Sequence, residues 1–273
     1  MMNTTKALEQ FNNDGYVVLG QVLSPDEISQ ANAGIDRHIA EHPDDLSHLK
    51  KGDSLICSPL KFSDSFDFLV EHPVTLELLG GILGENLALE EIGIIIREAK
   101  ALEEFKGWHR DLIRDFDRRF EIPYISCVFY LSDVGEEDHC LAVIPGTHDR
   151  LVDLNPKDCE QDAGVDINGP AGTVVLFHGR CIHSARMKAA SRQRRSVHIY
   201  YGLAGEPRTT EWTYYPERLR EKNDPNLPPK FYDKWQETRV IDGVGKIPEG
   251  IDHSLTIPEI IKEIQVRAKQ KMN

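Results

Sequence analysis

The sequence lacks the features that mark several classes of protein. None of its apolar runs approaches the roughly 18 residues that a membrane-spanning helix needs, and its first residues lack the apolar core of a signal peptide. Its five cysteines include no C-x-x-C pair, which argues against a structural zinc site and fits free thiols in a reducing compartment. We therefore expect a cytoplasmic protein without membrane association.

Basic residues are also scarce. The chain carries 32 Lys and Arg against 45 Asp and Glu, so its net charge is −13 at pH 7. Nucleic acids are bound through basic surfaces, and this charge argues against a general affinity for them. The charge does not identify another partner, because an acidic surface commonly serves solubility alone.

The residues that are present suffice for one large folded domain, with 273 residues of which 40% are hydrophobic. A turn at Asp14–Gly15 is expected to lead into a short strand at residues 16–19. Ser24 and Glu27 form a predicted capping box, so a helix is expected from Pro25 to about residue 41. Residues 42–53 are expected to form a polar loop, and residues 73–83 a second helix.

Short strands dominate the middle of the chain. Runs of β-branched and aromatic residues separated by turn residues predict strands at residues 92–97, 124–130, 140–144, 173–177 and 196–201. Strands without intervening helices favour an antiparallel barrel over an α/β sheet. We predict a mainly β fold with flanking helices around a double-stranded β-helix core, the jelly roll of cupin-like proteins.

The predicted organisation is a single domain. The jelly-roll core is expected at about residues 87–205, preceded by N-terminal helices within residues 1–86. Residues 206–273 are expected to form a C-terminal loop and helix region. Apolar residues at helical spacing within it predict an amphipathic helix at residues 258–271.

A His-x-Asp triplet can place two metal ligands side by side, and the chain has two such triplets. His42 follows a helix, with Pro inside its triplet, and is interpreted as a surface residue. His109 lies in the strand-rich half, where alternation would direct His109 and Asp111 to one face and Arg110 to the other. A third ligand is expected from a later strand. Periodicity does not choose between His178 and His183.

Four stretches in this order resemble the phytanoyl-CoA dioxygenase family of iron(II)- and 2-oxoglutarate-dependent oxygenases. The stretches are residues 14–18, 108–111, 140–148, and 176–183 continuing to Arg194. The combination is far more specific than any single stretch. The last 70 residues take no part in the resemblance.

The resemblance implies the ligands of the metal. His109, Asp111 and His183 would bind iron(II), with 2-oxoglutarate and O2 as co-substrates. The family's arginine for the far carboxylate of 2-oxoglutarate would be Arg194, eleven residues after His183, with Arg192 as the alternative. The planar guanidinium suits a carboxylate because it binds both oxygens. Ser184 and Arg97 are further candidates for co-substrate binding.

Candidates for substrate contacts come from strand alternation and from charge. Strand alternation aligns His198 and Tyr200 with Arg194, so both are candidates for the cavity wall. Arg114 and Arg118 would suit an anionic group on a small-molecule substrate, although a solvated loop explains them equally well.

The resemblance also favours one reaction. Halogenating relatives replace the metal-binding Asp by a small residue, and Asp111 is intact, so hydroxylation or another oxidation of an unactivated C–H bond is expected, with release of succinate and CO2. The alternatives are a cupin-like metal enzyme that does not use 2-oxoglutarate, and a non-catalytic barrel that binds a small ligand. The substrate and the oligomeric state stay open.

Overall fold

The computed structural model describes residues 3–48, 53–100, 104–111, 124–150, 154–205, 215–232, 240–241, 245–246 and 266. Its helices are α1 (Thr4–Asp14), α2 (Pro25–Glu41), α3 (Pro59–Phe62), α4 (Asp67–Val70), α5 (Pro73–Leu83) and α6 (Glu217–Arg220). Its strands are β1 (Tyr16–Gln21), β2 (Leu46–His48), β3 (Ser54–Ile56), β4 (Leu87–Arg97), β5 (Glu104–Phe105), β6 (Ile125–Tyr130), β7 (Cys140–Val143), β8 (Val165–Ile167), β9 (Thr173–His178), β10 (His183–Met187), β11 (Arg194–Leu203), β12 (Val240–Ile241) and β13 (Gly245–Lys246).

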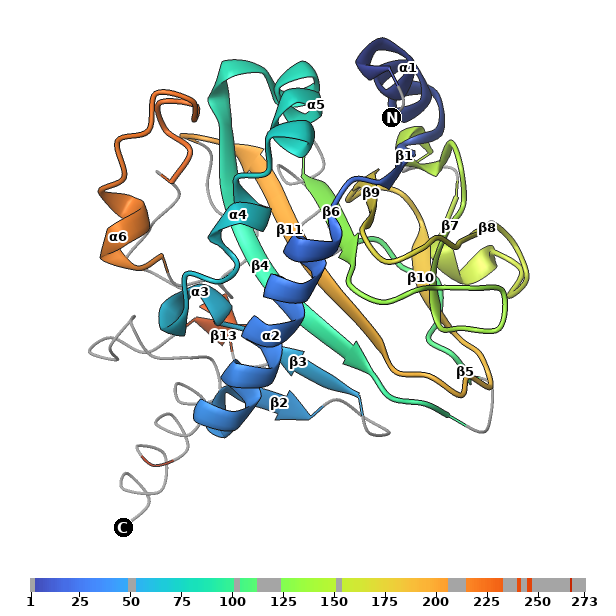
Figure 1. Cartoon of the computed structure of the whole chain (residues 1–273). Helices are drawn as coiled ribbons and strands as arrows, with labels where there is room; N and C mark the ends of the chain where they lie inside the picture. Colours follow the sequence, from blue (N-terminus) through green and yellow to red (C-terminus); the bar gives the residue numbers. More distant parts are fainter. Residues whose placement is uncertain are drawn as a thin grey trace.

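Two antiparallel sheets form the core. The larger has seven strands in the order β1-β9-β6-β11-β4-β3-β2, and the smaller has the order β5-β10-β7-β8. In Figure 1 the long strands β4 and β11 cross the centre of the molecule beneath α2 and α4. The predicted mainly β, jelly-roll architecture with flanking helices is confirmed.

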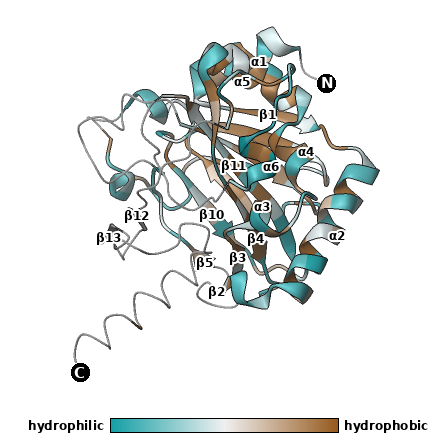
Figure 2. Cartoon of the chain, turned by 90° about the vertical axis from the view of Figure 1, so that its left-hand side faces the viewer, coloured by the Kyte–Doolittle hydropathy of each residue, from teal (hydrophilic) through white to brown (hydrophobic). Residues whose placement is uncertain are grey.

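The two faces of the large sheet have different partners because successive side chains alternate. Ile94, Phe129 and Ile199 belong to one apolar cluster with residues of α2, α4 and α5. Val128 and Phe177 face the other way, into a cluster with the small sheet. Figure 2 shows hydrophobic residues concentrated along the central strands and hydrophilic ones along α2. The inward face, between the two sheets, is where the site lies.

The helices predicted at residues 25–41 and 73–83 are confirmed as α2 and α5. α2 begins with the predicted capping box, in which the Ser24 hydroxyl accepts a hydrogen bond from the Glu27 backbone and the Glu27 carboxylate accepts one in return. α5 ends at Leu83 before Gly84, as expected.

No described helix has the length and apolar character needed to cross a membrane. The helix expected at residues 258–271 lies outside the described residues except for Val266, which is helical.

The prediction of a polar loop at residues 42–53 is wrong for residues 46–48, which form β2. Leu46 pairs with Ile56 in a β2–β3 hairpin that extends the large sheet, and the side chains of Asp45 and His38 meet at 2.9 Å in a buried contact. The hairpin is short and polar, and its register depends on β4, so local pattern does not reveal it. With β1, β2 and β3, the large sheet extends beyond the core expected at residues 87–205.

The Asp14–Gly15 turn packs against the turn between β9 and β10. The Gly15 carbonyl accepts hydrogen bonds from the His178 amide at 2.8 Å and from the Cys181 thiol at 3.2 Å. Gly15 has a φ of 75°, and a Cβ placed on it would lie 2.4 Å from Cys181 Sγ and from His148 Nδ1. Only glycine fits this close approach.

Gly15→Ala should therefore destabilise the protein more than Gly20→Ala. Gly20 has a nearly equal φ of 76°, but no atom lies within 4 Å of the position that a Cβ would take there, so it reports backbone strain alone. We expect a loss of about 1 kcal/mol in the free energy of unfolding for Gly20→Ala, and about 1–3 kcal/mol more for Gly15→Ala. Denaturant unfolding measures both, and equal losses would contradict the packing argument.

Candidate metal centre

Two imidazoles and one carboxylate converge at the inner edge of the small sheet. One ligand atom from each of His109, Asp111 and His183 lies within 4.8 Å of the other two. Asp111 Oδ1 is 3.2 Å from His183 Nε2 and 3.9 Å from His109 Nε2. Among the described residues this is the one group of three with the spacing of a metal site.

Backbone hydrogen bonds hold the three residues together. The His109 amide donates to the His183 carbonyl at 3.0 Å, and the His183 amide donates to the His109 carbonyl at 2.9 Å. The Asp111 amide donates to the Gly179 carbonyl at 3.1 Å. His109 thus joins β10 through an isolated bridge, where the sequence suggested a strand.

Arg110 points away from its two neighbours, as the alternation predicted. Its guanidinium is buried and donates to four backbone carbonyls, those of Thr147, Arg150, Leu154 and Arg180. These bonds fix the segment that carries His109 and Asp111 to the loops behind it.

Both histidines present Nε2 to the centre. His109 Nδ1 lies 3.2 Å from the Gly107 carbonyl, and His183 Nδ1 lies 3.1 Å from the Cys181 carbonyl. A carbonyl only accepts hydrogen bonds, so each Nδ1 carries a hydrogen, and Nε2 is the nitrogen at which a metal ion would replace a proton. Two imidazole nitrogens and a carboxylate oxygen are a donor set that fits a divalent iron ion.

Ser126 orients the carboxylate of the triad. Its hydroxyl donates to Asp111 Oδ2 at 3.2 Å, which leaves Oδ1 facing the two histidines. Burial alone would raise the pKa of Asp111, but His183, His109 and the Ser126 hydroxyl together lower it to about 2. The carboxyl group is therefore ionised, as a metal ligand must be.

The open choice between two histidines is resolved by position. His178 lies at the end of β9 with its ring stacked on Phe11 at 6.4 Å, and its Nδ1 accepts a hydrogen bond from the Arg180 amide. Burial lowers the pKa of His178 to about 3, so it packs as a neutral ring. His42 stacks on Phe62 and is not part of the triad.

The inward face of β11 leads from the triad to a buried arginine. His198 Nε2 lies 3.0 Å from the Ser196 hydroxyl, and Arg194 Nη2 reaches the same hydroxyl at 3.4 Å. Burial lowers the pKa of His198 to about 3. Tyr200 continues the row, with its ring stacked on Tyr124 at 5.1 Å.

Arg194 is poorly satisfied by the residues around it. Its side chain is buried, with 3% of the residue exposed, its other hydrogen bond is a long one of 3.4 Å to the His139 carbonyl, and its guanidinium lies 5.7 Å from the centroid of the Tyr130 ring. Its Nε has no hydrogen-bond partner, and no ion pair to a carboxylate is found for it among the described residues. A buried guanidinium in this state fits an incoming carboxylate.

The other candidates lie in different surroundings. Arg192 is largely exposed and pairs with Asp138. Arg97 lies directly opposite Arg194 in the sheet but forms an ion pair with Asp53 at 2.6 Å. Ser184 pairs with Ala142 on the face of β10 opposite to His183, away from the triad. Arg114 and Arg118 lie outside the described residues.

The sequence interpretation missed Asp53 and Ser126. Ser126 is a polar residue inside an otherwise apolar run, and that contrast is a usable signal. Asp53 had no such signal, because its partner Arg97 is 44 residues away.

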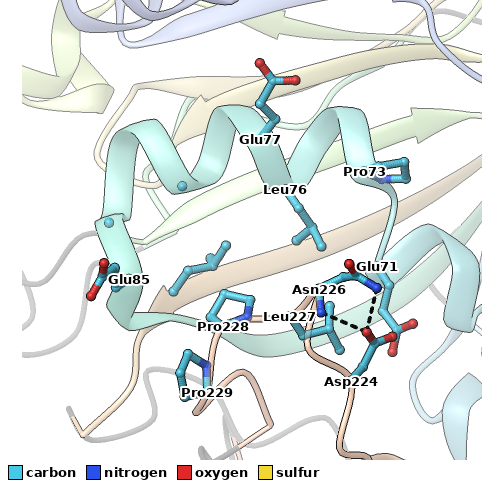
Figure 3. Close-up of a pocket in the computed structure, with 13 residues that line it drawn as sticks. Glu71, Pro73, Leu76, Glu77, Glu85, Asp224, Asn226, Leu227, Pro228 and Pro229 are labelled. Carbon is cyan, nitrogen blue, oxygen red and sulfur yellow. Dashed lines mark hydrogen bonds between the residues drawn. The ribbon is translucent and has the colours of Figure 1, made fainter.

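A surface cleft among the described residues lies apart from the triad. It has a volume of about 980 Å³ and lies between α5 and residues 224–229, where Leu76 and Leu227 line an apolar floor (Figure 3). None of the triad or β11 residues lines it.

Comparisons with known proteins find one matching family model and a related protein. The family model for phytanoyl-CoA dioxygenase (PhyH) matches residues 11–196. A probable alpha-ketoglutarate-dependent hypophosphite dioxygenase of Stutzerimonas stutzeri is 25% identical over 165 residues, which are 54% of this chain and 56% of that protein. The match thus spans little more than half of that relative's length.

Solved structures share the fold. The non-heme alpha-ketoglutarate-dependent epimerase SnoN from nogalamycin biosynthesis superposes with a TM-score of 0.63 at 22% identity, over 74% of this chain and 83% of that chain. HygX from Streptomyces hygroscopicus, with nickel and 2-oxoglutarate bound, superposes with a TM-score of 0.60 at 18% identity, over 76% of this chain and 90% of that chain. At these identities the likeness concerns the fold.

Ser126→Ala should weaken metal binding, because Asp111 would lose the hydrogen bond that fixes its outer oxygen. Residues that orient a metal ligand in this way typically contribute about tenfold or more to affinity. Anaerobic titration with cobalt(II), followed by absorbance, measures the dissociation constant. Ser58→Ala removes another buried serine, which precedes α3 and is not part of the triad, and serves as the control. Equal affinities in the two variants would contradict the role of Ser126.

Proposed function

The chain belongs to the phytanoyl-CoA dioxygenase family, and from this membership and the geometry of the triad we propose that it is an iron(II)- and 2-oxoglutarate-dependent oxygenase. We further propose that it hydroxylates an unactivated C–H bond of a small organic molecule and releases succinate and CO2. The observation that carries the proposal is the pairing of a two-histidine, one-carboxylate triad with a buried arginine that has no carboxylate partner among the described residues.

The triad and the residues of β11 would have different roles. His109, Asp111 and His183 would hold iron(II) on one face, and the bound metal supplies the site where 2-oxoglutarate and O2 react. Arg194 would bind the far carboxylate of 2-oxoglutarate. Ser196 and His198 lie between Arg194 and the triad, so the co-substrate would extend along the inward face of β11.

The surroundings of the triad favour one protonation pattern. Neutral His198 would donate a hydrogen bond to an oxygen of the co-substrate without adding charge, since burial and Arg194 both lower its pKa. The stacked rings of Tyr124 and Tyr200 form an apolar wall that would exclude water from the reacting atoms. We propose Tyr200 and His198 as contacts at the cavity wall on this basis.

The reaction type rests on Asp111. A carboxylate ligand occupies the position that a halide would need, which supports hydroxylation over halogenation. The hypophosphite dioxygenase named among the relatives oxidises a small inorganic anion according to its name, so hypophosphite and small phosphonates belong in a substrate panel beside organic acids. Release of succinate scores every member of the panel.

Asp111→Ala should abolish succinate formation while the chain stays folded. Without the carboxylate the triad loses one of three ligands and the charge that offsets the metal. Succinate is measured after anaerobic assembly with iron(II) and 2-oxoglutarate followed by oxygen, and circular dichroism checks the fold. Retained turnover in a folded Asp111→Ala protein would refute the assignment of the triad.

Arg194→Gln and Arg192→Gln separate the two arginine candidates. Loss of a buried partner for a carboxylate commonly costs several kcal/mol, so the KM for 2-oxoglutarate should rise on the order of a hundredfold in Arg194→Gln. The exposed Arg192 should give a KM close to that of the wild type. The reverse order would transfer the role to Arg192.

A further inference from the structure

A row of three charged residues crosses three neighbouring strands beside the site. Arg194 on β11 lies directly opposite Arg97 on β4. The pairing of Ser54 with Ile96 places Asp53, just before β3, opposite Arg97 on its other side. Residues directly opposite each other in a sheet share a face, so the inward face carries a row of two positive charges and one negative charge.

Asp53 is engaged on both of its oxygens. Its Oδ2 lies 2.6 Å from Arg97 Nη1, and its Oδ1 lies 2.8 Å from Lys100 Nζ. Lys106 lies further out, at 3.7 Å, and has other partners as well. The Asp53 side chain is fully buried, and although burial opposes ionisation, Lys100 and Arg97 keep the pKa of Asp53 below its usual value.

The count of charges leaves a positive excess. Arg97, Lys100 and Arg194 contribute three positive charges, and Asp53 contributes one negative charge, so the row and its lysine carry a net charge of +2. Asp53 is within reach of Arg97 and Lys100, whereas Arg194 has no carboxylate partner in the part of the chain described here. The field of Asp53 still acts on Arg194, since Asp53 is among the groups that raise its pKa.

We propose that Asp53 limits the affinity of the pocket for dicarboxylates. Resting on the proposed function, this assignment gives Asp53 two effects. It occupies Arg97, so that Arg194 alone offers an open guanidinium to the far carboxylate. It also places a negative charge near that carboxylate, which lowers the affinity for 2-oxoglutarate and for succinate alike.

Weaker binding of succinate would favour its release after turnover. Succinate, the product, retains the far carboxylate of 2-oxoglutarate and would bind to the same arginine. A pocket with three uncompensated cations would retain this product after turnover. Asp53 therefore favours product release at the expense of co-substrate affinity.

Two substitutions of opposite charge test the proposal. Asp53→Asn removes a negative charge with little change in shape, and Lys100→Gln removes a positive one. Asp53 lies two strands away from Arg194, about 10 Å, and at this separation a unit charge changes anion affinity by about three- to tenfold. The dissociation constants for 2-oxoglutarate and succinate should fall by that factor in Asp53→Asn and rise in Lys100→Gln.

The measurement is calorimetric titration. Succinate is titrated into metal-free protein, and 2-oxoglutarate into protein loaded anaerobically with iron(II), each at low and high salt. Asp67→Asn is the matched control, because Asp67 also pairs with an arginine, Arg218, but lies on α4 outside the sheets. It should leave both constants unchanged. Salt should reduce the difference between Asp53→Asn and the wild type.

The outcomes separate the two proposals. If the wild-type protein loaded with iron(II) does not bind 2-oxoglutarate, the proposed function fails and Asp53 loses its role with it. If the wild type binds but Asp53→Asn binds no more tightly than Asp67→Asn, the role of Asp53 alone is overturned. Should Asp53→Asn fail to fold, Lys100→Gln decides, and unchanged affinity in that variant overturns the proposal.

Discussion

The site depends on a pair of backbone hydrogen bonds between His109 and His183. These bonds join a segment without regular structure to the first residue of β10. They bring the two rings together, with their centroids 4.3 Å apart. Side-chain chemistry completes the triad, but the main chain determines that the three ligands meet.

Strand alternation explains how much of this was predictable. The assignment of β11 residues to one face follows from a period of two, and the register with β6 and β4 confirms it. Arg110 turning away from His109 and Asp111 follows from the same rule. The choice of His183 over His178 did not follow from periodicity, because both flank one turn. The family resemblance indicated His183, and the packing of His178 against Phe11 agrees with it.

Features that join distant parts of the chain were not predictable. Asp53 contacts Arg97, and Ser126 contacts Asp111. Both contacts join residues that are distant in the sequence, so no local pattern indicates them. The β2–β3 hairpin was missed for the same reason. The net charge of −13 also gave no hint of the interior, where Arg194 is buried on the inward face opposite the partly buried Arg97. The net charge of the whole chain therefore does not predict the sign of the charge at the inward face.

The contact between the Gly15 carbonyl and the Cys181 thiol also constrains when the protein can fold. The two residues are 166 positions apart. At typical rates of translation, roughly 5 to 20 residues per second, the first turn would wait about 8 to 33 seconds for its partner to be synthesised. Throughout that interval Val17 lacks β9, the strand with which it pairs. The Asp14–Gly15 turn can therefore reach its final packing only after Cys181 has been synthesised.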